Sequence, residues 1–363
     1  MMFLALREFK HAKFRFLLIS CIMILISLLV LFVTGLAKGL SFDNASSIES
    51  MKANYIVLQK DSDKRLSHST LNNENLNEVQ QYISEKNATP LGIQMTTIMK
   101  DGESKKIDAS FFAIDTNEFL QPKVIEGRMI NNGTKSEVVV DASLKDDGIR
   151  LGDKIIDQIS GKEFQVVGFT ENQSFSHTPV IHLNFNEWTM IFNANQGFNA
   201  IALNTKSDHA KNLEEKIVGI EVIQKDEALK GIPGYKEEQG SLYMMIIFLF
   251  IIGAFVLAVF FYVITIQKIN QFGVLKAIGS KTSYLAKNIV SQVLVLTVAS
   301  LILSSLLTYG LSKILPNSMP FVYNLQLVVG CSLLFLVVAL IGSLLSLYRI
   351  TKIDAVEAIG RAN

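Results

Sequence analysis

The chain has 363 residues, of which 49% are hydrophobic and only 18% are charged, whereas soluble domains carry about 25% charged residues. Its net charge of +1 hides an uneven distribution, because residues 38–241 hold 22 basic and 30 acidic side chains while the remainder holds 12 and 3. The composition excludes an ordinary soluble protein and indicates an acidic soluble part joined to a basic, apolar part.

Four uncharged segments reach the length of about 20 residues that is needed to cross a bilayer. We predict a transmembrane helix in each of them: residues 16–36, 242–266, 288–312 and 322–348. Basic residues precede the first segment, as they do in a secretory signal peptide. Its apolar core is longer than the roughly 7–15 residues of such a signal, so we expect it to remain as an anchor.

The basic residues predict the orientation of the chain. The N-terminal tail (1–15), the segment 267–287 and the C-terminal tail (349–363) are all net basic. Basic segments flanking membrane helices stay on the cytoplasmic side. We therefore expect a multi-pass protein of the cell membrane with both tails and the 267–287 loop in the cytoplasm, and residues 38–241 outside.

Residues 38–241 are expected to form an α+β domain of one or two lobes. Alternation of apolar and polar residues predicts strands at 54–60, 136–142, 154–170 and 178–185. Helical periodicity predicts helices at 75–86 and 210–220. Both cysteines, Cys21 and Cys331, fall within the predicted membrane helices, so we expect no disulfide in this domain.

No catalytic centre is predicted in this domain. His177 and His182 are five residues apart across the predicted strand 178–185 and would point to opposite faces, which argues against joint metal binding. Trp188 is the single tryptophan, and we interpret it as a packing residue.

The segment "FGVLKAIGSKTSYL" (272–285) resembles a phosphate-binding loop but has the wrong spacing. Five residues separate Gly273 from Gly279, and Ser280 precedes Lys281, whereas the motif needs four residues between its glycines and a lysine directly after the second. We therefore expect no ATP site in this chain.

Two stretches resemble a known family. The run "IEGRMINNGTKSEVVVDASLKDDGIRLGDKIIDQISGKEFQVVGFTEN" is similar to the extracytoplasmic domain of the FtsX/MacB-type permeases of ABC transporters, in which Gly-Arg, Glu-Val-Val-Val, Leu-Gly-Asp and Val-Val-Gly occur in the same order. Within that family, "FYVITIQKINQFGVLKAIGSKTSYL" and "KIDAVEAIG" look closest to the HrtB-like haem-efflux permeases of Gram-positive bacteria.

The resemblance implies an integral membrane protein with four transmembrane helices and a MacB-like α+β domain between helices 1 and 2. It implies a homodimer that pairs with two copies of a separate cytoplasmic ABC ATPase, without an ATPase site or an intrinsic cofactor of its own. Haem or a porphyrin would be the transported substrate, in contact with membrane lipid, and no nucleic acid would bind. Permeases of the same architecture that export a peptide, an antibiotic or a lipid are alternatives, as is a mechanical transducer acting on cell-wall enzymes.

The 267–287 loop is a candidate coupling segment. Ile269, Phe272, Leu275 and Ile278 recur every three residues, which predicts an apolar stripe on a short helix that Gly279 would end. Lysines 268, 276 and 281 could meet acidic groups on the ATPase or lipid phosphates. The alternative is a basic loop that only fixes the topology. With the resemblance, we predict an ATPase-coupling surface made of Ile269, Phe272, Gly273, Leu275, Lys276, Ile278 and Gly279.

A substrate site is predicted beside the second membrane helix. On a helix, Tyr235, Glu238, Leu242 and Met245 share one face, and phenol, carboxylate and thioether groups are possible ligands of haem iron. With the resemblance, we predict a haem site made of Glu238, Tyr235, Met245, Met244, Phe42 and Lys38, with Glu238 and Tyr235 as iron ligands. The alternative is a solvated carboxylate at a helix start and lipid-facing methionines.

Overall fold

A computed structural model describes residues 13–192, 197–316 and 319–351. The predicted tails therefore lie largely outside the described residues. The chain forms two compact units. The membrane unit contains the residues up to Lys38, Ser241–Pro316 and the chain from Phe321 on, and the β-domain contains Gly39–Gly240.

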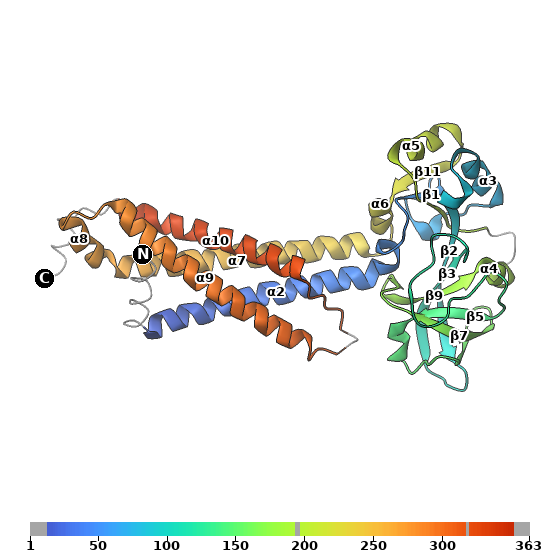
Figure 1. Cartoon of the computed structure of the whole chain (residues 1–363), viewed down its shortest axis with the longest axis horizontal. Coiled ribbons are helices and arrows are strands. Elements are labelled where there is room, and N and C mark those ends of the chain that lie inside the picture. The colour runs from blue at the N-terminus through green and yellow to red at the C-terminus, as the bar shows by residue number, and fades with distance from the viewer. Residues whose placement is uncertain (1–12, 193–196, 317–318, 352–363) are drawn as a thin grey trace. The chain divides into compact units, whose positions relative to one another are not determined.

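The membrane unit is built from long apolar helices: α2 (Lys13–Glu49), α7 (Tyr235–Gln267), α9 (Thr282–Ser312) and α10 (Leu325–Thr351), with the short α8 (Ile269–Ala277) between α7 and α9. Within the described residues, four helices are long and apolar enough to cross a membrane, which agrees with the predicted fold class. A helix satisfies its backbone hydrogen bonds internally and so tolerates lipid. Figure 1 shows α10 lying along α9, and Met23, Phe261, Val293 and Phe335 are part of the core of this unit.

Two of these helices run beyond their apolar stretches. The predicted first span ends at residue 36, but α2 continues to Glu49, and α7 begins at Tyr235, ahead of the predicted second span. The end of α2 packs into the β-domain core through Ala45 and Ile48. The Lys225 ammonium donates to the carbonyl oxygens of Glu49 and Met51 at 3.1 and 3.0 Å, which satisfies carbonyls that the helix end leaves unpaired.

The β-domain combines eleven described strands with short helices. The strands are β1 (Tyr55–Gln59), β2 (Ala88–Lys100), β3 (Lys106–Ile114), β4 (Val124–Gly127), β5 (Glu137–Asp141), β6 (Lys154–Asp157), β7 (Glu163–Thr170), β8 (Ser174–Phe175), β9 (Thr178–Asn184), β10 (Ala200–Leu203) and β11 (Ile220–Gln224). The helices are α3 (Asn73–Tyr82), α4 (Phe185–Phe192), α5 (Ser207–Lys216) and α6 (Lys225–Lys230). The predicted α+β fold is confirmed.

Six strands close into a ring. The pairs run β2–β3, β3–β9, β9–β5, β5–β7, β7–β6 and back from β6 to β2. The interior is packed with side chains such as Phe111, Val138, Phe164 and Ile181. Trp188 on α4 belongs to this core, and its Nε1 donates to the Gly197 carbonyl at 2.9 Å, as expected for a packing residue.

A second lobe is formed at the other end of the long strand β2. There the strand order is β11–β1–β10–β2, and α3 and α5 belong to this lobe (Figure 1). Val79 of α3 and Leu213 of α5 pack with Val57, Ile201 and Leu203 of the strands. The domain therefore has two lobes that share one continuous sheet.

Strand β9 presents different chemistry on its two faces. Ile181 and Leu183 lie in the ring interior, whereas Val180 belongs to the core cluster outside the ring. Because side chains alternate along a strand, His182 shares the outer face with Val180. A polar imidazole is thus buried among the apolar residues that pack outside the ring.

Candidate functional site

A polar cluster forms within the β-domain where the end of α2, the start of α7 and the β8–β9 turn come together. The Asn44 amide donates to Oε2 of Glu238 at 2.6 Å. Nε2 of His177 lies 3.2 Å from the same oxygen, and Nδ1 of His177 lies 3.0 Å from Oδ2 of Asp43. One imidazole therefore bridges carboxylates from two helices that are far apart in sequence.

The geometry of the β8–β9 turn positions this imidazole. Phe175 pairs with Thr178, so the hairpin loop has two residues, and Ser176 and His177 both have positive φ angles, 53° and 59°. Two positive φ values are the pattern of a type I′ turn, which normally uses Asn and Gly. The turn thus holds two non-glycine residues in a conformation that costs them roughly 1–2 kcal/mol each.

Glu238 is the centre of the cluster. Its side chain is only 22% exposed, and Oε2 is the shared partner of Asn44 and His177. These two contacts to Oε2 hold the Glu238 carboxylate in one orientation. Oxygen and imidazole nitrogen donors suit hard and borderline metal centres, although the described residues contain no group of three or more His, Cys, Asp and Glu side chains arranged around one metal position.

Tyr235 lies at the edge of the same cluster. Its hydroxyl is 3.3 Å from Oγ of Ser41 on α2, one turn of α7 before Glu238. The structure therefore brings two of the predicted site residues to the same pair of helix ends.

The other predicted site residues lie apart from this cluster. Met244 and Met245 are exposed on α7, and Lys38 is exposed on α2. Phe42 lines a cavity of the β-domain together with His182. Asn44, Asp43 and His177 were not predicted.

The prediction that His177 and His182 lie on opposite faces of one strand was wrong. His177 occupies the turn, while His182 lies within β9. The two imidazoles have different surroundings: His177 contacts Asp43 and Glu238, whereas His182 lines a cavity of the β-domain. The turn carries neither Asn nor Gly, so the usual sequence signal for a two-residue hairpin is absent.

Helix α8 shows the predicted ending at Gly279. Ser280 N–H donates to the Leu275 carbonyl at 2.9 Å, Gly279 N–H donates to the Lys276 carbonyl at 2.9 Å, and Gly279 has φ of 94°. These two bonds are those of a Schellman motif, which favours glycine at this position. Gly273 is buried and Lys276 half-buried.

The surface of α8 differs in part from the prediction. Leu275 packs against the membrane-unit core, whereas Ile278 is 74% exposed and Val274, which was not predicted, is also exposed. The side chains of Ile269 and Phe272 lie outside the described part of the structure.

Lys268 is not the surface cation that its sequence context predicts. It is buried, and its ammonium donates to Oε1 of Gln292 on α9 at 2.8 Å. Burial of a lysine is costly unless it is hydrogen-bonded, and this bond ties the junction between α7 and α8 to α9. Lys268 therefore belongs to the packing of the membrane unit.

Comparison with known proteins assigns the chain to a class. The MacB-like periplasmic core domain matches residues 16–220, and the FtsX-like permease C-terminal domain matches residues 243–355. The chain belongs to the FtsX/MacB-type permeases of ABC transporters. These permeases are non-catalytic membrane subunits that work with an ATPase subunit, so the prediction that this chain is not itself an enzyme is confirmed.

Individual relatives cover almost the whole chain. A protein of Staphylococcus epidermidis named "Putative hemin transport system permease protein HrtB" is 34% identical over 98% of this chain and 99% of its own length. A protein of the same name from Staphylococcus haemolyticus is 33% identical over the same shares. An uncharacterized ABC transporter permease of Mycobacterium tuberculosis, Rv0072, is 23% identical over 99% of both chains.

Among solved structures, the periplasmic region of MacB from Actinobacillus actinomycetemcomitans is similar to 49% of this chain and 92% of that one, with 16% identity and a TM-score of 0.38. The extracellular domain of the transporter YknZ is similar to 47% of this chain and 100% of that one, with 16% identity and a TM-score of 0.36.

Proposed function

We propose that this permease exports haem or a closely related porphyrin from the membrane, driven by a separate cytoplasmic ATPase. The observation that carries the proposal is the full-length similarity to two staphylococcal proteins named for hemin transport. The cluster around Glu238 supplies the matching chemistry. Haem is a flat, apolar molecule with two propionates and an iron that accepts side-chain ligands.

Glu238 is the proposed iron ligand, with Tyr235 as the second candidate. The Glu238 carboxylate is fixed by Asn44 and His177, so it presents one oxygen in a preset orientation. A carboxylate is a weaker haem ligand than a pair of imidazoles, which suits a transporter that must release its substrate. Met244 and Met245 are exposed on α7, and polarizable thioethers suit contact with an apolar ring.

His177 is the residue that couples this site to α2. Its imidazole contacts both Asp43 and Glu238. Iron bound to the Glu238 carboxylate would withdraw electron density from it and weaken its contacts with His177 and Asn44, so substrate binding changes the contact between the two helices. This contact offers a route by which substrate is sensed.

The proposed assembly is a homodimer with two copies of the ATPase. Both tails and α8 lie in the cytoplasm, and the β-domain lies outside, as the basic residues indicate. Ile278 and Val274 are exposed apolar side chains on α8, and we assign them, with Lys276, to the ATPase contact. ATP binding and hydrolysis by the partner would squeeze the helices and expel haem outward.

Substitution of Glu238 tests the proposal. Glu238→Gln keeps the size of the side chain and an acceptor for Asn44 but removes the charge. We expect the affinity of the Glu238 site for haem in the purified permease to fall at least tenfold, about 1.4 kcal/mol, and cells to become haem-sensitive. Glu237→Ala is the matched control, because Glu237 is the exposed neighbour on the same helix.

The contrast between the two variants is decisive. A general loss of acidic charge would affect both alike, whereas a ligand role affects only Glu238. Wild-type protein that neither binds haem nor protects cells against it would refute the haem assignment and leave an exporter of another substrate.

A further inference from the structure

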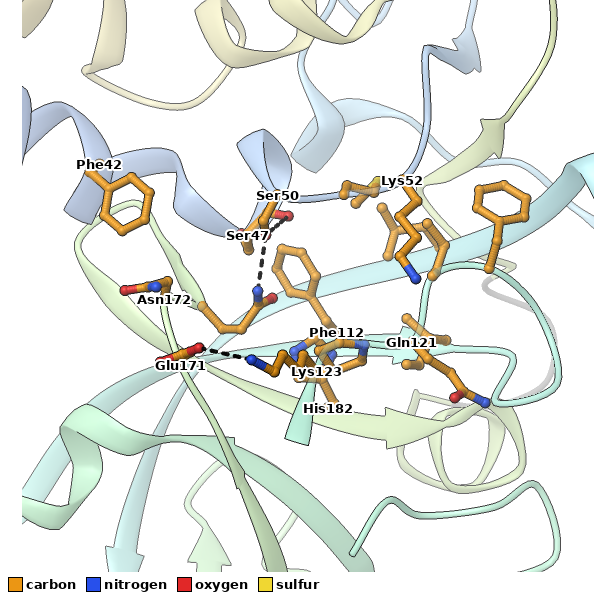
Figure 2. Close-up of a pocket in the computed structure, with 17 residues that line it drawn as sticks. Phe42, Ser47, Ser50, Lys52, Phe112, Gln121, Lys123, Glu171, Asn172 and His182 are labelled. Carbon is orange, nitrogen blue, oxygen red and sulfur yellow. Dashed lines mark hydrogen bonds and ion pairs between the residues drawn. The ribbon is translucent and has the colours of Figure 1, made fainter. Parts of the chain in front are cut away.

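The β-domain contains a cavity of about 500 Å³, and Glu238, Asn44 and His177 are not among its lining residues. Figure 2 shows the side chains that line it. Pockets that bind small molecules typically measure about 300–1,000 Å³ and combine apolar walls with a few polar groups. This cavity fits that description. Its walls include Phe42, Phe112 and Phe119, and its polar lining includes His182, Lys52 and Lys123.

His182 is the unusual group in the lining. It is only 3% exposed, and within the described part of the chain neither ring nitrogen has a hydrogen-bond partner. Leaving a buried polar group unsatisfied costs about 1–3 kcal/mol. A leucine at this position on the outer face of β9 would avoid that cost, so the imidazole lowers the stability of the fold.

Burial also determines which form of the imidazole is present. Desolvation lowers the pKa of His182 from 6.5 to about 3. The side chain is therefore neutral at physiological pH, with an N–H on one nitrogen and a free lone pair on the other. Neutral histidine is the form that binds metals, because the lone pair of one ring nitrogen is not occupied by a proton.

Two residues that line the cavity with His182 are exposed and can move at little cost. Both ring nitrogens are closed to solvent, and Gln121 and Lys123, exposed residues of the β3–β4 connection, line the same cavity. Lys123 pairs with Glu171 at 3.8 Å, with side chains 83% and 50% exposed. Such exposed pairs contribute at most about 1 kcal/mol, so the Lys123 ammonium can exchange Glu171 for a carboxylate of a ligand.

We propose that this cavity is a second binding site for an iron porphyrin, with His182 as the iron ligand and Lys52 and Lys123 facing the propionates. The ligand class rests on the proposed function. Binding is ligand exchange without redox chemistry: the free lone pair of His182 replaces a water or carboxylate oxygen on the iron. The aromatic walls stack on the ring, and the two lysines neutralise its carboxylates.

The cavity is placed to receive haem after Glu238 releases it. Phe42 lines the cavity, and its neighbour Asp43 contacts His177 of the Glu238 cluster. Consecutive residues of α2 thus belong to the two sites. Imidazole is the stronger iron ligand of the two, so transfer from Glu238 to His182 runs toward the tighter site within the β-domain.

The test is a titration of the full-length permease in detergent with ferric haem, followed by absorption and electron paramagnetic resonance. We expect the wild type to show an imidazole-ligated component that His182→Leu loses, with affinity for that component falling at least tenfold. Glu238→Gln should retain this component. His209→Asn is the control, because His209 is exposed on α5, and Trp188 fluorescence checks that each variant is folded.

The outcomes separate this proposal from the proposed function. If His182→Leu leaves the spectrum and stoichiometry unchanged while Glu238→Gln abolishes binding, the cavity proposal is wrong and the exporter proposal stands. If His182→Leu alone removes binding, the cavity proposal stands and the role of Glu238 is wrong. The cavity proposal is also wrong if metal-free protoporphyrin binds with the same affinity as haem and His182→Leu does not change that affinity. Failure of the wild type to bind haem refutes both.

Discussion

The buried imidazole of His182 should make the stability of the β-domain depend on pH. Its pKa is about 3 in the folded chain and 6.5 when solvated, so below pH 6.5 the unfolded chain binds a proton that the folded chain does not. Stability rises with pH wherever the unfolded state binds more protons. The contribution of neutral His182 is therefore complete above pH 6.5 and is lost progressively as the pH falls toward 3.

The size of the effect follows from the two pKa values. Between about pH 7.5 and about pH 5.5 a single group with these values lowers the free energy of unfolding by about 1.3 kcal/mol. For a unit of this size that corresponds to a fall of about 3–5 °C in the melting temperature. The His182→Leu variant should lack this component and be at least as stable as the wild type at neutral pH, because no unsatisfied ring nitrogen remains.

The single tryptophan provides the assay. Trp188 is buried in the ring core of the β-domain, so its fluorescence reports the unfolding of that domain in the full-length protein. Unfolding should be measured at both pH values for the wild type, His182→Leu and the exposed-histidine control His209→Asn. Other groups titrate too, among them Asp141, whose pKa burial raises, and the difference between variants removes their contribution.

The comparison can fail in two informative ways. A pH dependence that is the same in His182→Leu and the wild type would mean that the imidazole is hydrogen-bonded or protonated in solution. A large loss of stability at neutral pH in His182→Leu would mean that the ring makes polar contacts in the folded protein. Either result would remove the physical basis for a free lone pair.

Three further predictions concern other parts of the chain. His177→Gly should change stability by less than about 1 kcal/mol, because relief of the positive φ offsets the loss of two half-exposed contacts. It should nevertheless weaken haem binding, and a strong loss of stability would show that the imidazole is only a structural link. Ile278→Asp should abolish co-purification of the permease with the ATPase, while the unfolding of the β-domain followed by Trp188 fluorescence stays unchanged. If the variant still assembles fully with the ATPase, α8 only fixes the membrane topology and does not contact the ATPase. Gly127→Ala should destabilise the β-domain by at least about 2 kcal/mol, because Gly127 has φ of 77° and an added Cβ would lie 2.3 Å from the Val167 carbonyl oxygen and 2.7 Å from Cδ1 of Leu151. Gly102→Ala, with φ of 80° and open space around it, should cost only the backbone strain, and equal losses in the two glycine variants would contradict the steric account.

The membrane part of the fold could be predicted because its signal is local and long. An uncharged run of about 20 residues has few alternatives to a membrane helix, and four such runs were visible. The strands with clear alternation, such as β5 and β9, were also predictable. The long β2–β3 hairpin was missed, because β2 has apolar or small residues on both faces from Ala88 to Ile93 and therefore lacks the period of two.

Only part of the candidate site could be predicted, because the sequence shows relations within one segment but not contacts between distant segments. Helical spacing placed Tyr235 and Glu238 on one face of α7, and that spacing is a property of a single segment. Nothing in the sequence connects Glu238 with Asn44, 194 residues away, or with His177, which reaches it from a turn without the usual Asn-Gly signal.

Local chemistry alone therefore determined the class of this protein: apolar runs of bilayer length, an acidic domain between the first two of them, and a short helix ended by Gly279. Only tertiary structure decided which side chains meet. The β8–β9 turn brings His177 between two helix ends, and the apolar residues that pack against the outer face of the six-stranded ring bury His182 there. Contacts between distant segments depend on strand order and turn geometry, which are set by packing of the whole domain.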